Sequence, residues 1–412
     1  MGSRNLTESW TPTGRALSRR DLLRLLALGS VAGGLAACGA STTTQGPTES
    51  PPAATGSPAA GATTAPPTQA ATPVPSTVAG LTLRQKIGQL LVVGFVGQRA
   101  SKTSAVGRAI AAGELGGVIL FDRNIASPTQ LADLTGGLRS LAPDPASLVV
   151  AVDQEGGQVA RLRPSNGFPR VVSQAVVGGH DVSFATDVYG AMAATLSRAG
   201  INLNLAPVVD VNINPKNPAI GALGRSFSAD PAVVTAMGRA AIRAHHSRGV
   251  LTSLKHFPGL GSATINTDVA PADVTRTWTS LELEPYRELL TGDADCVMVG
   301  HMLNRTLDKA APASLSGPTV QGLLRDDLGW QGAVITDDLQ ARAIARQFKR
   351  ADAIAATLNA GVDLLLFSTA TSDPAFYRDL VTSIARLVTS GRVDEGRIDE
   401  AVSRAAQLRS QL

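Results

Sequence analysis

The sequence predicts a (β/α)8 barrel of the TIM type, formed by a single domain that follows a disordered linker. Three observations support this fold class. Short apolar runs recur eight times after residue 79, and longer stretches rich in Ala, Leu and Arg separate them. Polar residues directly follow most of these runs. Strands that are buried on both faces have this continuous apolar pattern, and their alternation with helices is typical of a parallel sheet.

Each expected strand is four or five residues long, as the apolar runs require. The eight strands are expected at Leu91–Phe95, Gly117–Phe121, Leu148–Val152, Asn202–Ala206, Leu251–Lys255, Cys296–Val299, Ala333–Thr336 and Asp363–Phe367. Helical patterns lie between them, including Ser183–Arg198, Pro231–Ser247, Ser280–Leu290 and Arg350–Asn359. Eight such units fit a barrel. The alternative is a doubly wound open sheet, which would call for a glycine-rich phosphate fingerprint after an early strand, and the sequence contains none.

The first 38 residues read as a signal peptide with a lipoprotein cleavage box. Residues 18–23 carry a twin-arginine pattern, and the apolar stretch that follows is too short and too rich in Gly for a comfortable membrane span. Small residues precede Cys38. We expect export, lipidation of Cys38 and anchoring to the outer face of the cell membrane. The alternative is an ordinary secretory signal with an incidental cysteine.

Residues 39–78 form the expected linker. They are mostly Ala, Thr, Pro, Ser and Gly, with Glu49 as the only charge. Such a segment has too few apolar residues to bury a core and is expected to be disordered. The folded domain is expected at residues 79–412. The second cysteine, Cys296, lies in an apolar run, and we expect it to be a buried free thiol.

The composition limits the possible partners and cofactors. The chain has 412 residues and a hydrophobic content of 44%, which allows a sizeable core, but only 4% aromatic residues, so that core is mainly aliphatic. The first 37 residues account for +3 of the net charge of +4, which argues against a nucleic-acid partner. The sequence has no metal-ligand spacing and no phosphate loop, so we expect no metal and no cofactor. We expect a monomer.

Polar residues occupy the same topological position after five of the expected strands. They are Asp122-Arg123-Asn124, Asp153-Gln154-Glu155, Lys255-His256, His301 and Asp337-Asp338. In a barrel the carboxyl-terminal ends of the strands meet at one face, and the active site lies there. The pattern therefore predicts a site at this face. His180, His245 and His246 fit solvated positions instead, and His301 either lines the pocket or supports it from behind.

Asp337 is the candidate nucleophile. It directly follows the apolar run 333–336, so a strand would hold it rigidly at the barrel mouth. A carboxylate in that place can attack an anomeric carbon and form a covalent glycosyl-enzyme. The alternative is that one of Asp337 and Asp338 caps the next helix. Both roles are compatible if Asp338 is the cap.

Several other residues are candidates for holding a polyol ligand such as a sugar. Asp153, at a strand end, can accept hydrogen bonds from adjacent hydroxyl groups. Arg161 either orients Asp153, reaches the ligand or forms a structural ion pair. Arg225 lies in a long loop and is a candidate donor to the substrate, with a solvated arginine as the alternative. Lys255 and His256 end a strand, and a Gly/Pro-rich loop follows them and carries Asp268.

These motifs resemble glycoside hydrolase family 3, and within it the single-domain bacterial β-N-acetylglucosaminidases that trim cell-wall sugars. The resemblance runs from about Leu81 to the end of the chain. It rests on Leu81–Leu90, Asp153–Gly157, Ala206–Val211, Gly224–Phe227, Lys255–Gly259 and Thr336–Leu339, which occur in the family's order. Together with the amino-terminal signal, the chain resembles a lipoprotein of the actinobacterial type.

The resemblance implies a retaining exo-β-glycosidase that removes terminal N-acetylglucosamine from cell-wall-derived fragments without a cofactor. Asp337 matches the nucleophile of that family. The residues that match its sugar-binding positions are Asp153, Arg161, Arg225, Lys255 and His256.

The chain departs from this family in the loop after Gly259. The family loop reads Lys-His-Phe-Pro-Gly-His-Gly, then four further residues, then Asp-Ser-His, whose last residue is the general acid/base. Here Leu260 replaces the His that follows Gly259, Asn266 replaces the Asp, and Asp268 replaces the last His. Asp268 is therefore the candidate acid/base. The alternatives are a catalytically impaired lipoprotein that binds sugars or muropeptides, and a family 3 glycosidase of changed sugar preference, because Gln158 and Ala341 also depart from the pattern.

Overall fold

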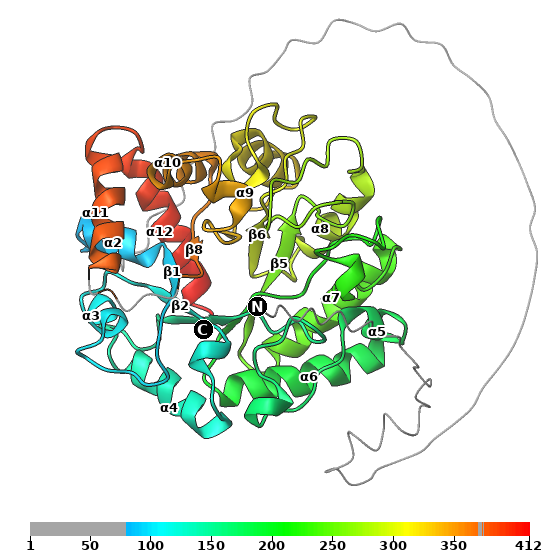
Figure 1. Ribbon diagram of the computed structural model, residues 1–412, viewed down its shortest axis with the longest axis horizontal. Helices are drawn as coiled ribbons and strands as arrows, with labels where there is room; N and C mark the ends of the chain where they lie inside the picture. Colours follow the sequence, from blue (N-terminus) through cyan, green and yellow to red (C-terminus); the bar gives the residue numbers. More distant parts are fainter. Residues whose placement is uncertain (1–79, 370–372, 374) are drawn as a thin grey trace, which may run out of the picture. The chain divides into compact units, whose positions relative to one another are not determined.

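The computed structural model describes residues 80–412 apart from residues 370–372 and 374. The predicted signal, linker and lipidated Cys38 lie outside these residues. Eight parallel strands form one sheet in the order β7-β6-β5-β4-β3-β2-β1-β8. The helices surround them (Figure 1). The predicted (β/α)8 barrel is thus confirmed. Within the described part of the chain, no helix is long and apolar enough to cross a membrane.

The strands agree closely with the apolar runs of the sequence. They are β1 Leu91–Gly94, β2 Gly117–Leu120, β3 Val149–Val152, β4 Leu203–Asn204, β5 Leu251–Phe257, β6 Cys296–Val299, β7 Ala333–Thr336 and β8 Leu365–Phe367. Every residue of these strands is buried, as expected for a sheet that is covered on both faces. Strand β5 continues two residues beyond the predicted end at Lys255, so His256 also belongs to the strand itself.

A π-helix, Pro318–Asp327, lies between β6 and β7, and the α-helices follow the expected alternation. They are α2 Leu83–Gln89, α3 Ala105–Ala111, α4 Pro128–Arg139, α5 Gln174–Gly178, α6 Val182–Arg198, α7 Pro231–His246, α8 Glu284–Leu289, α9 Arg342–Ala345, α10 Arg350–Ala360, α11 Phe376–Thr389 and α12 Glu395–Arg409. The predicted helix Ser280–Leu290 splits into a 3-10 turn, Ser280–Leu283, and α8, because Pro285 cannot continue the turn's backbone hydrogen bonding and instead begins a helix.

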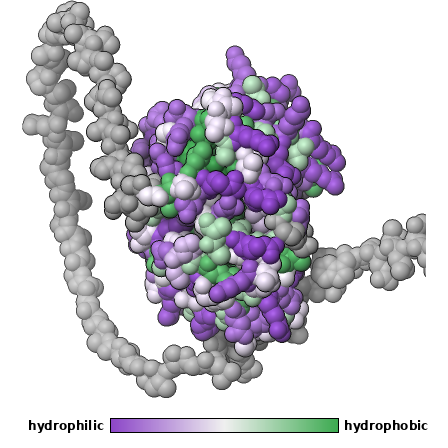
Figure 2. All heavy atoms as spheres, turned by 90° about the vertical axis from the view of Figure 1, so that its left-hand side faces the viewer, coloured by the Kyte–Doolittle hydropathy of each residue, from purple (hydrophilic) through white to green (hydrophobic). Residues whose placement is uncertain are grey.

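The helices turn their apolar faces to the barrel and their polar faces outward. Figure 2 shows that the surface on the side of α2, α3 and α11 is mainly hydrophilic, with smaller apolar patches. Beneath the helices, one large cluster of buried, mostly aliphatic side chains fills the core. Cys296 lies in this core as a free thiol, and burial raises its pKa to about 12, so it stays protonated.

The barrel closes between β7 and β8 through backbone hydrogen bonds. The amides of Thr336, Leu339 and Leu364 donate to the carbonyls of Leu364, Leu366 and Val334 at 2.9–3.0 Å. A single parallel bridge joins Ile335 to Leu364 outside the named strands. The Thr336 hydroxyl accepts the amide of Leu366 at 2.9 Å, in a place where a strand ladder would offer a carbonyl. Asp363 adds a bond to this seam, because its carboxylate accepts the Val334 amide at 3.0 Å.

Asp363 also gathers a buried ion cluster at the beginning of β8. Its two oxygens lie 2.8 Å from Arg325 and 2.7 Å from Arg397, and Arg404 lies 3.4 Å away. Arg325 and Asp363 are 1% and 0% exposed. Buried charges of this kind depend on each other, because removing one leaves the other without a counter-charge in a medium of low polarity.

The substitution Asp363→Ala is expected to lower the free energy of unfolding by about 3–5 kcal/mol, because Arg325 would remain buried and unpaired. The control is Asp352→Ala, which removes an ion pair with Arg392 whose side chains are 49% and 48% exposed. It should cost less than about 1 kcal/mol. Urea denaturation of both variants measures the difference. Equal losses would contradict this account of the seam.

The sequence prediction that His245 is solvated is wrong. His245 is fully buried in α7, with Nδ1 2.7 Å from the Ala241 carbonyl and Nε2 3.0 Å from the Asn204 amide nitrogen. An amide nitrogen donates, so Nε2 accepts and Nδ1 carries the proton. Burial lowers the pKa of His245 to about 4, and the ring is neutral. His180 and His246 are exposed as predicted, and Nε2 of His246 lies 2.7 Å from Asp295 Oδ2.

This buried histidine predicts a pH dependence of stability. Unfolding returns His245 to a pKa of about 6.5. Between pH 6.5 and about 4 the unfolded chain therefore binds the extra proton, and stability falls as the pH falls, by up to about 3 kcal/mol. In His245→Gln this contribution should disappear, whereas in His180→Gln it should stay. Denaturant titrations at several pH values measure the slopes, and identical slopes in all three proteins would contradict the assignment.

Candidate active site

A polar pocket of about 300 Å³ opens at the carboxyl-terminal ends of the strands. All seven residues singled out from the sequence line it, namely Asp153, Arg161, Arg225, Lys255, His256, Asp268 and Asp337. They come from the ends of β3, β5 and β7 and from the loops after β3, β4 and β5. The parallel sheet thus brings together residues that lie up to 184 positions apart in the sequence, from Asp153 to Asp337.

Lys255 is held between two carboxylates on one side of the pocket. Its ammonium nitrogen lies 2.8 Å from Asp153 Oδ1 and 2.7 Å from Glu155 Oε1. The lysine side chain is 3% exposed and that of Glu155 is 1% exposed. Burial opposes ionisation of Glu155, but Arg225 and Lys255 outweigh it and hold the pKa of this carboxyl well below its usual range. The group is a buried carboxylate between two cations.

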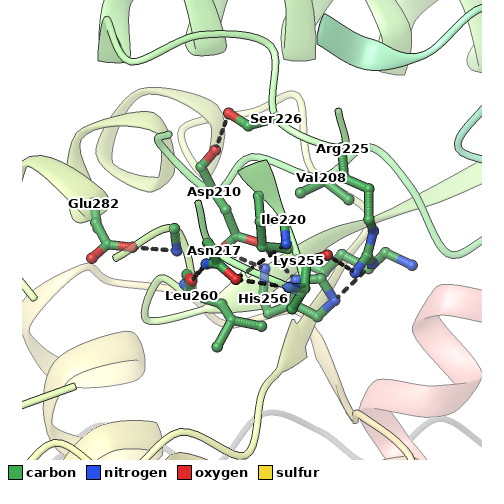
Figure 3. A network of polar contacts seen from close by, with 12 residues as sticks. Val208, Asp210, Asn217, Ile220, Arg225, Ser226, Lys255, His256, Leu260 and Glu282 are labelled. Carbon is green, nitrogen blue, oxygen red and sulfur yellow. Dashed lines mark hydrogen bonds and ion pairs between the residues drawn. The ribbon is translucent and has the colours of Figure 1, made fainter. Parts of the chain in front are cut away.

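Arg225 directs most of its hydrogen-bond donors at the protein itself (Figure 3). Its Nε and Nη2 donate to the two oxygens of Glu155 at 2.7 and 2.8 Å, and Nη1 donates to the Ala219 carbonyl at 2.8 Å. This bidentate pair fixes the guanidinium beside the pocket. Sequence reasoning placed Glu155 at this face of the barrel but assigned it no role. The signal was available, since Glu155 lies two positions after Asp153, a spacing that places extended side chains on the same face.

Arg161 keeps more of its donors free. Its Nη2 is 3.7 Å from Asp153 Oδ2, and its buried Nε has no hydrogen-bond partner among the described residues. The guanidinium lies 5.5 Å from the centre of the Phe121 ring, which Arg123 approaches at 4.4 Å. An arginine with a free buried donor at a pocket wall is suited to a ligand oxygen. Arg161 thus both contacts Asp153 and faces the pocket.

His256 is oriented by a buried aspartate that sequence reasoning did not assign to the site. Nδ1 of His256 lies 2.7 Å from Asp210 Oδ2, and the other Asp210 oxygen accepts the amides of His256 at 3.2 Å and Leu260 at 2.7 Å (Figure 3). Asp210 is completely buried. Its sequence signal was a single carboxylate in an apolar segment after β4, which by itself does not reveal a partner on β5.

Asp337 lies half-buried directly after β7. Its backbone amide donates to the Val299 carbonyl at 2.9 Å, and Oδ1 accepts the Asp338 amide at 2.8 Å. Burial alone would raise its pKa, but the positive potential of His301 and His256 outweighs burial, and the pKa of Asp337 is lowered. The group is therefore a carboxylate near neutral pH, the state that a nucleophile needs.

Asp268 lies on the loop after β5 and faces the same pocket from its solvent-exposed side. Its pKa is raised, first because the pocket wall displaces water from the carboxyl group and second because Asp337 is negative. Solvent access to the exposed side chain moderates this effect. Two neighbouring carboxyl groups whose pKa values move in opposite directions can act as acid and as nucleophile.

Two neighbours of Asp337 support the site from behind. The alternative that Asp337 or Asp338 caps the next helix is wrong, because Ala341 occupies the N-cap of α9. Asp338 instead accepts the backbone amides of Gln340 at 3.1 Å and Ser368 at 3.0 Å. It thereby joins the loops after β7 and β8. His301 is buried, with Nε2 2.8 Å from the Asp338 carbonyl and Nδ1 2.7 Å from the Ser314 hydroxyl.

The two further departures noted in the sequence lie outside this pocket. Gln158 is exposed and faces a neighbouring cavity between the loops after β3 and β4. Ala341 is buried beneath the β7 loop and is not one of the pocket-lining residues. The departures that do line the pocket are therefore Leu260, Asn266 and Asp268, all in the loop after β5.

A barrel with a small polar pocket at its mouth and two carboxyl groups of opposite pKa shift has the architecture of a glycoside hydrolase. Comparison with known proteins defines the family. Residues 82–408 match the glycosyl hydrolase family 3 N terminal domain. The chain belongs to glycosyl hydrolase family 3.

Relatives and solved structures agree with this membership. The chain is 31% identical to β-hexosaminidase A of Pseudoalteromonas piscicida over 81% of its own length and 62% of the relative's. It is 32% identical to a β-hexosaminidase of Nitrosomonas eutropha, over 71% and 85% of the two chains. A β-N-acetylhexosaminidase from Beutenbergia cavernae superimposes with a TM-score of 0.74 at 31% identity, covering 81% of this chain and 99% of that one.

A family 3 β-N-acetylglucosaminidase from a Paenibacillus species superimposes with a TM-score of 0.75 at 35% identity. The alignment covers 81% of this chain and 63% of that enzyme. The chain thus spans less than two thirds of the Pseudoalteromonas and Paenibacillus proteins, and most of the length of the Beutenbergia protein.

Proposed function

We propose that this protein is a retaining exo-β-N-acetylglucosaminidase, a β-N-acetylhexosaminidase, that acts on cell-wall-derived fragments. Asp337 is the nucleophile in this proposal and Asp268 the general acid/base. The observation that carries it is the pairing of these two groups in one pocket, one with a lowered and one with a raised pKa. The names of the relatives and structural neighbours support the choice of sugar.

The reaction proceeds in two steps. In the first, the protonated Asp268 carboxyl donates its proton to the glycosidic oxygen as the bond from that oxygen to C1 breaks, and an oxygen of Asp337 forms an ester bond with C1. In the second, Asp268 takes a proton from water, the water oxygen attacks C1, and Asp337 leaves as a carboxylate. Two inversions retain the β configuration.

The other pocket residues hold the terminal sugar. Asp153 accepts a hydrogen bond from Lys255 and has further lone pairs that can accept hydrogen bonds from hydroxyl groups. The free donors of Arg161 are suited to a carbonyl or hydroxyl oxygen. Hydrogen bonds to such charged groups contribute about 1.5–3 kcal/mol each. A pocket of about 300 Å³ is at the lower end of the range for ligand sites, and its size favours a single terminal unit and hence exo action.

A second candidate function is a lipoprotein that binds sugars without cleaving them. The exposure of Asp268 favours it, because solvent limits how far the pKa of an exposed carboxyl can rise. A glycosidase of changed sugar preference has less support, because Gln158 and Ala341 do not line the pocket.

Aryl β-N-acetylglucosaminides with good and poor leaving groups test the proposal. Asp337→Asn should abolish turnover of both. Asp268→Ala should lower kcat/KM for the poor leaving group by about 10²–10⁴-fold. It should lower kcat/KM for the activated substrate by less than about tenfold, since kcat/KM reports the first step and an activated group leaves without a proton. Asp273→Ala, an exposed carboxylate outside the pocket, serves as the control and should keep wild-type activity.

The outcomes separate the two candidates. If calorimetry shows binding of N-acetylglucosamine and no aryl glycoside is turned over, the result favours the sugar-binding lipoprotein over the enzyme. Turnover that survives Asp337→Asn would exclude Asp337 as the nucleophile.

We also propose that the mature protein is an exported monomer held at the membrane by a lipid on Cys38. The twin-arginine pattern and the small residues before Cys38 support this location. In Cys38→Ser, the full-length protein should move from the membrane fraction to the soluble fraction of the cell, because the lipidated residue is lost. Cys296→Ser is the matched control. A wild-type protein that is already soluble would contradict the anchor.

A further inference from the structure

The loop that carries Asp268 is held firmly at its base. The amide of Leu260 donates to Asp210 Oδ1 at 2.7 Å, and the next amide, that of Gly261, donates to Glu282 Oε2 at 2.7 Å (Figure 3). The Asn217 side chain donates to the Leu260 carbonyl at 2.6 Å. Glu282 and Asp210 are completely buried. Gly259 is required at this point, because a Cβ there would lie 2.5 Å from Glu282 Cβ.

The far end of the loop rests on the segment that follows the nucleophile. The amide of Ala343 donates to the Thr267 carbonyl at 3.1 Å, and the amide of Arg342 donates to the Asp268 carbonyl at 3.4 Å. These two amides belong to the beginning of α9, five and six residues after Asp337. The backbone that carries the acid is therefore attached to the backbone that carries the nucleophile.

Between these anchors, Asn266 organises a tight turn. Its side-chain oxygen accepts the amide of Asp268 at 2.9 Å, and its carbonyl accepts the amides of Val269 at 3.0 Å and Ala270 at 3.1 Å. Asn is well suited to this arrangement, because its short amide can hydrogen-bond the backbone two residues further on. Asn266 is half-buried and lines the catalytic pocket.

The charge at position 266 matters because negative groups already surround Asp268. Asp337 and Asp338 face it from the β7 loop, and the positive groups that face it are Arg225 from the β4 loop and His256 from β5. An aspartate at position 266 would preserve the hydrogen-bond acceptor but bring a further negative charge to the turn. An asparagine supplies the same acceptor without the charge.

We propose that Asn266 is a positioning residue for the acid/base Asp268. Its side-chain oxygen fixes the backbone of the turn, so that the carboxyl group points at the bond to be broken, and its neutrality protects the Asp268–Asp337 pair from additional repulsion. The loop thus combines a carboxylic acid at position 268 with a neutral hydrogen-bond acceptor at position 266. This inference rests on the proposed function.

Three variants of the full-length enzyme separate the two parts of the role. Asn266→Ala removes the acceptor, and kcat for the poor leaving group should fall about tenfold while KM stays nearly unchanged. Asn266→Ser restores a neutral acceptor and most of the activity. Asn266→Asp keeps the acceptor but adds charge, which disfavours the ionised form of Asp268. The alkaline limb of the pH–rate profile should then move up by about one pH unit.

The activated substrate and the variant Asp268→Ala are the controls that separate a failure of the positioning role from a failure of the proposed acid. Support for the inference is a loss in Asn266→Ala that is confined to the poor leaving group, together with the shifted limb in Asn266→Asp. Equal loss on both substrates, or an unshifted limb, would overturn it. If Asp268→Ala itself fails to distinguish the substrates, the proposed acid is wrong. If it distinguishes them and Asn266→Ala does not, only the positioning role is wrong. Melting temperatures confirm that all variants are folded.

Discussion

The buried contact of Lys255 with Asp153 and Glu155 is the constraint on which the rest of the site depends. One ammonium group joins the ends of β3 and β5, and Arg225 adds the loop after β4 through Glu155. Each charge in this group has a counter-charge within hydrogen-bond distance, so the cluster tolerates burial that a single ion would not. The side of the pocket that we propose binds sugar is therefore rigid before any ligand arrives, and binding would need little reorganisation.

The opposite side of the pocket is organised by backbone rather than by ion pairs. Asp337 is fixed by its own strand and by the Val299 carbonyl, and the acid loop is attached to α9 and to two buried carboxylates. Asp268 itself stays accessible to solvent, which suits a group that must exchange protons with water in every cycle. In the proposed reaction, the fixed backbone holds Asp337 in place, and the solvent access of Asp268 allows it to exchange protons with water.

The sequence predicted the strands well because each is a short apolar run buried on both faces, and a barrel then fixes where their ends meet. That is why Asp153, Lys255 and Asp337 could be placed together without a structure. The roles of Glu155, Asp210 and His245 were missed because they come from partners on other elements. His245 looked like a solvated residue on a helix until Asn204 of β4 provided its hydrogen bond.

The seam between β7 and β8 matters for the effect of partial unfolding on the pocket. One parallel bridge and several backbone hydrogen bonds close the barrel there, and a threonine hydroxyl accepts one further amide. A local opening of this seam would release the end of β7. Because Asp337 follows β7, such an opening would displace the proposed nucleophile while the ion cluster around Lys255 is still intact. A protein opened in this way by heat would keep the side chains that we propose bind sugar and would lose the proposed hydrolytic activity.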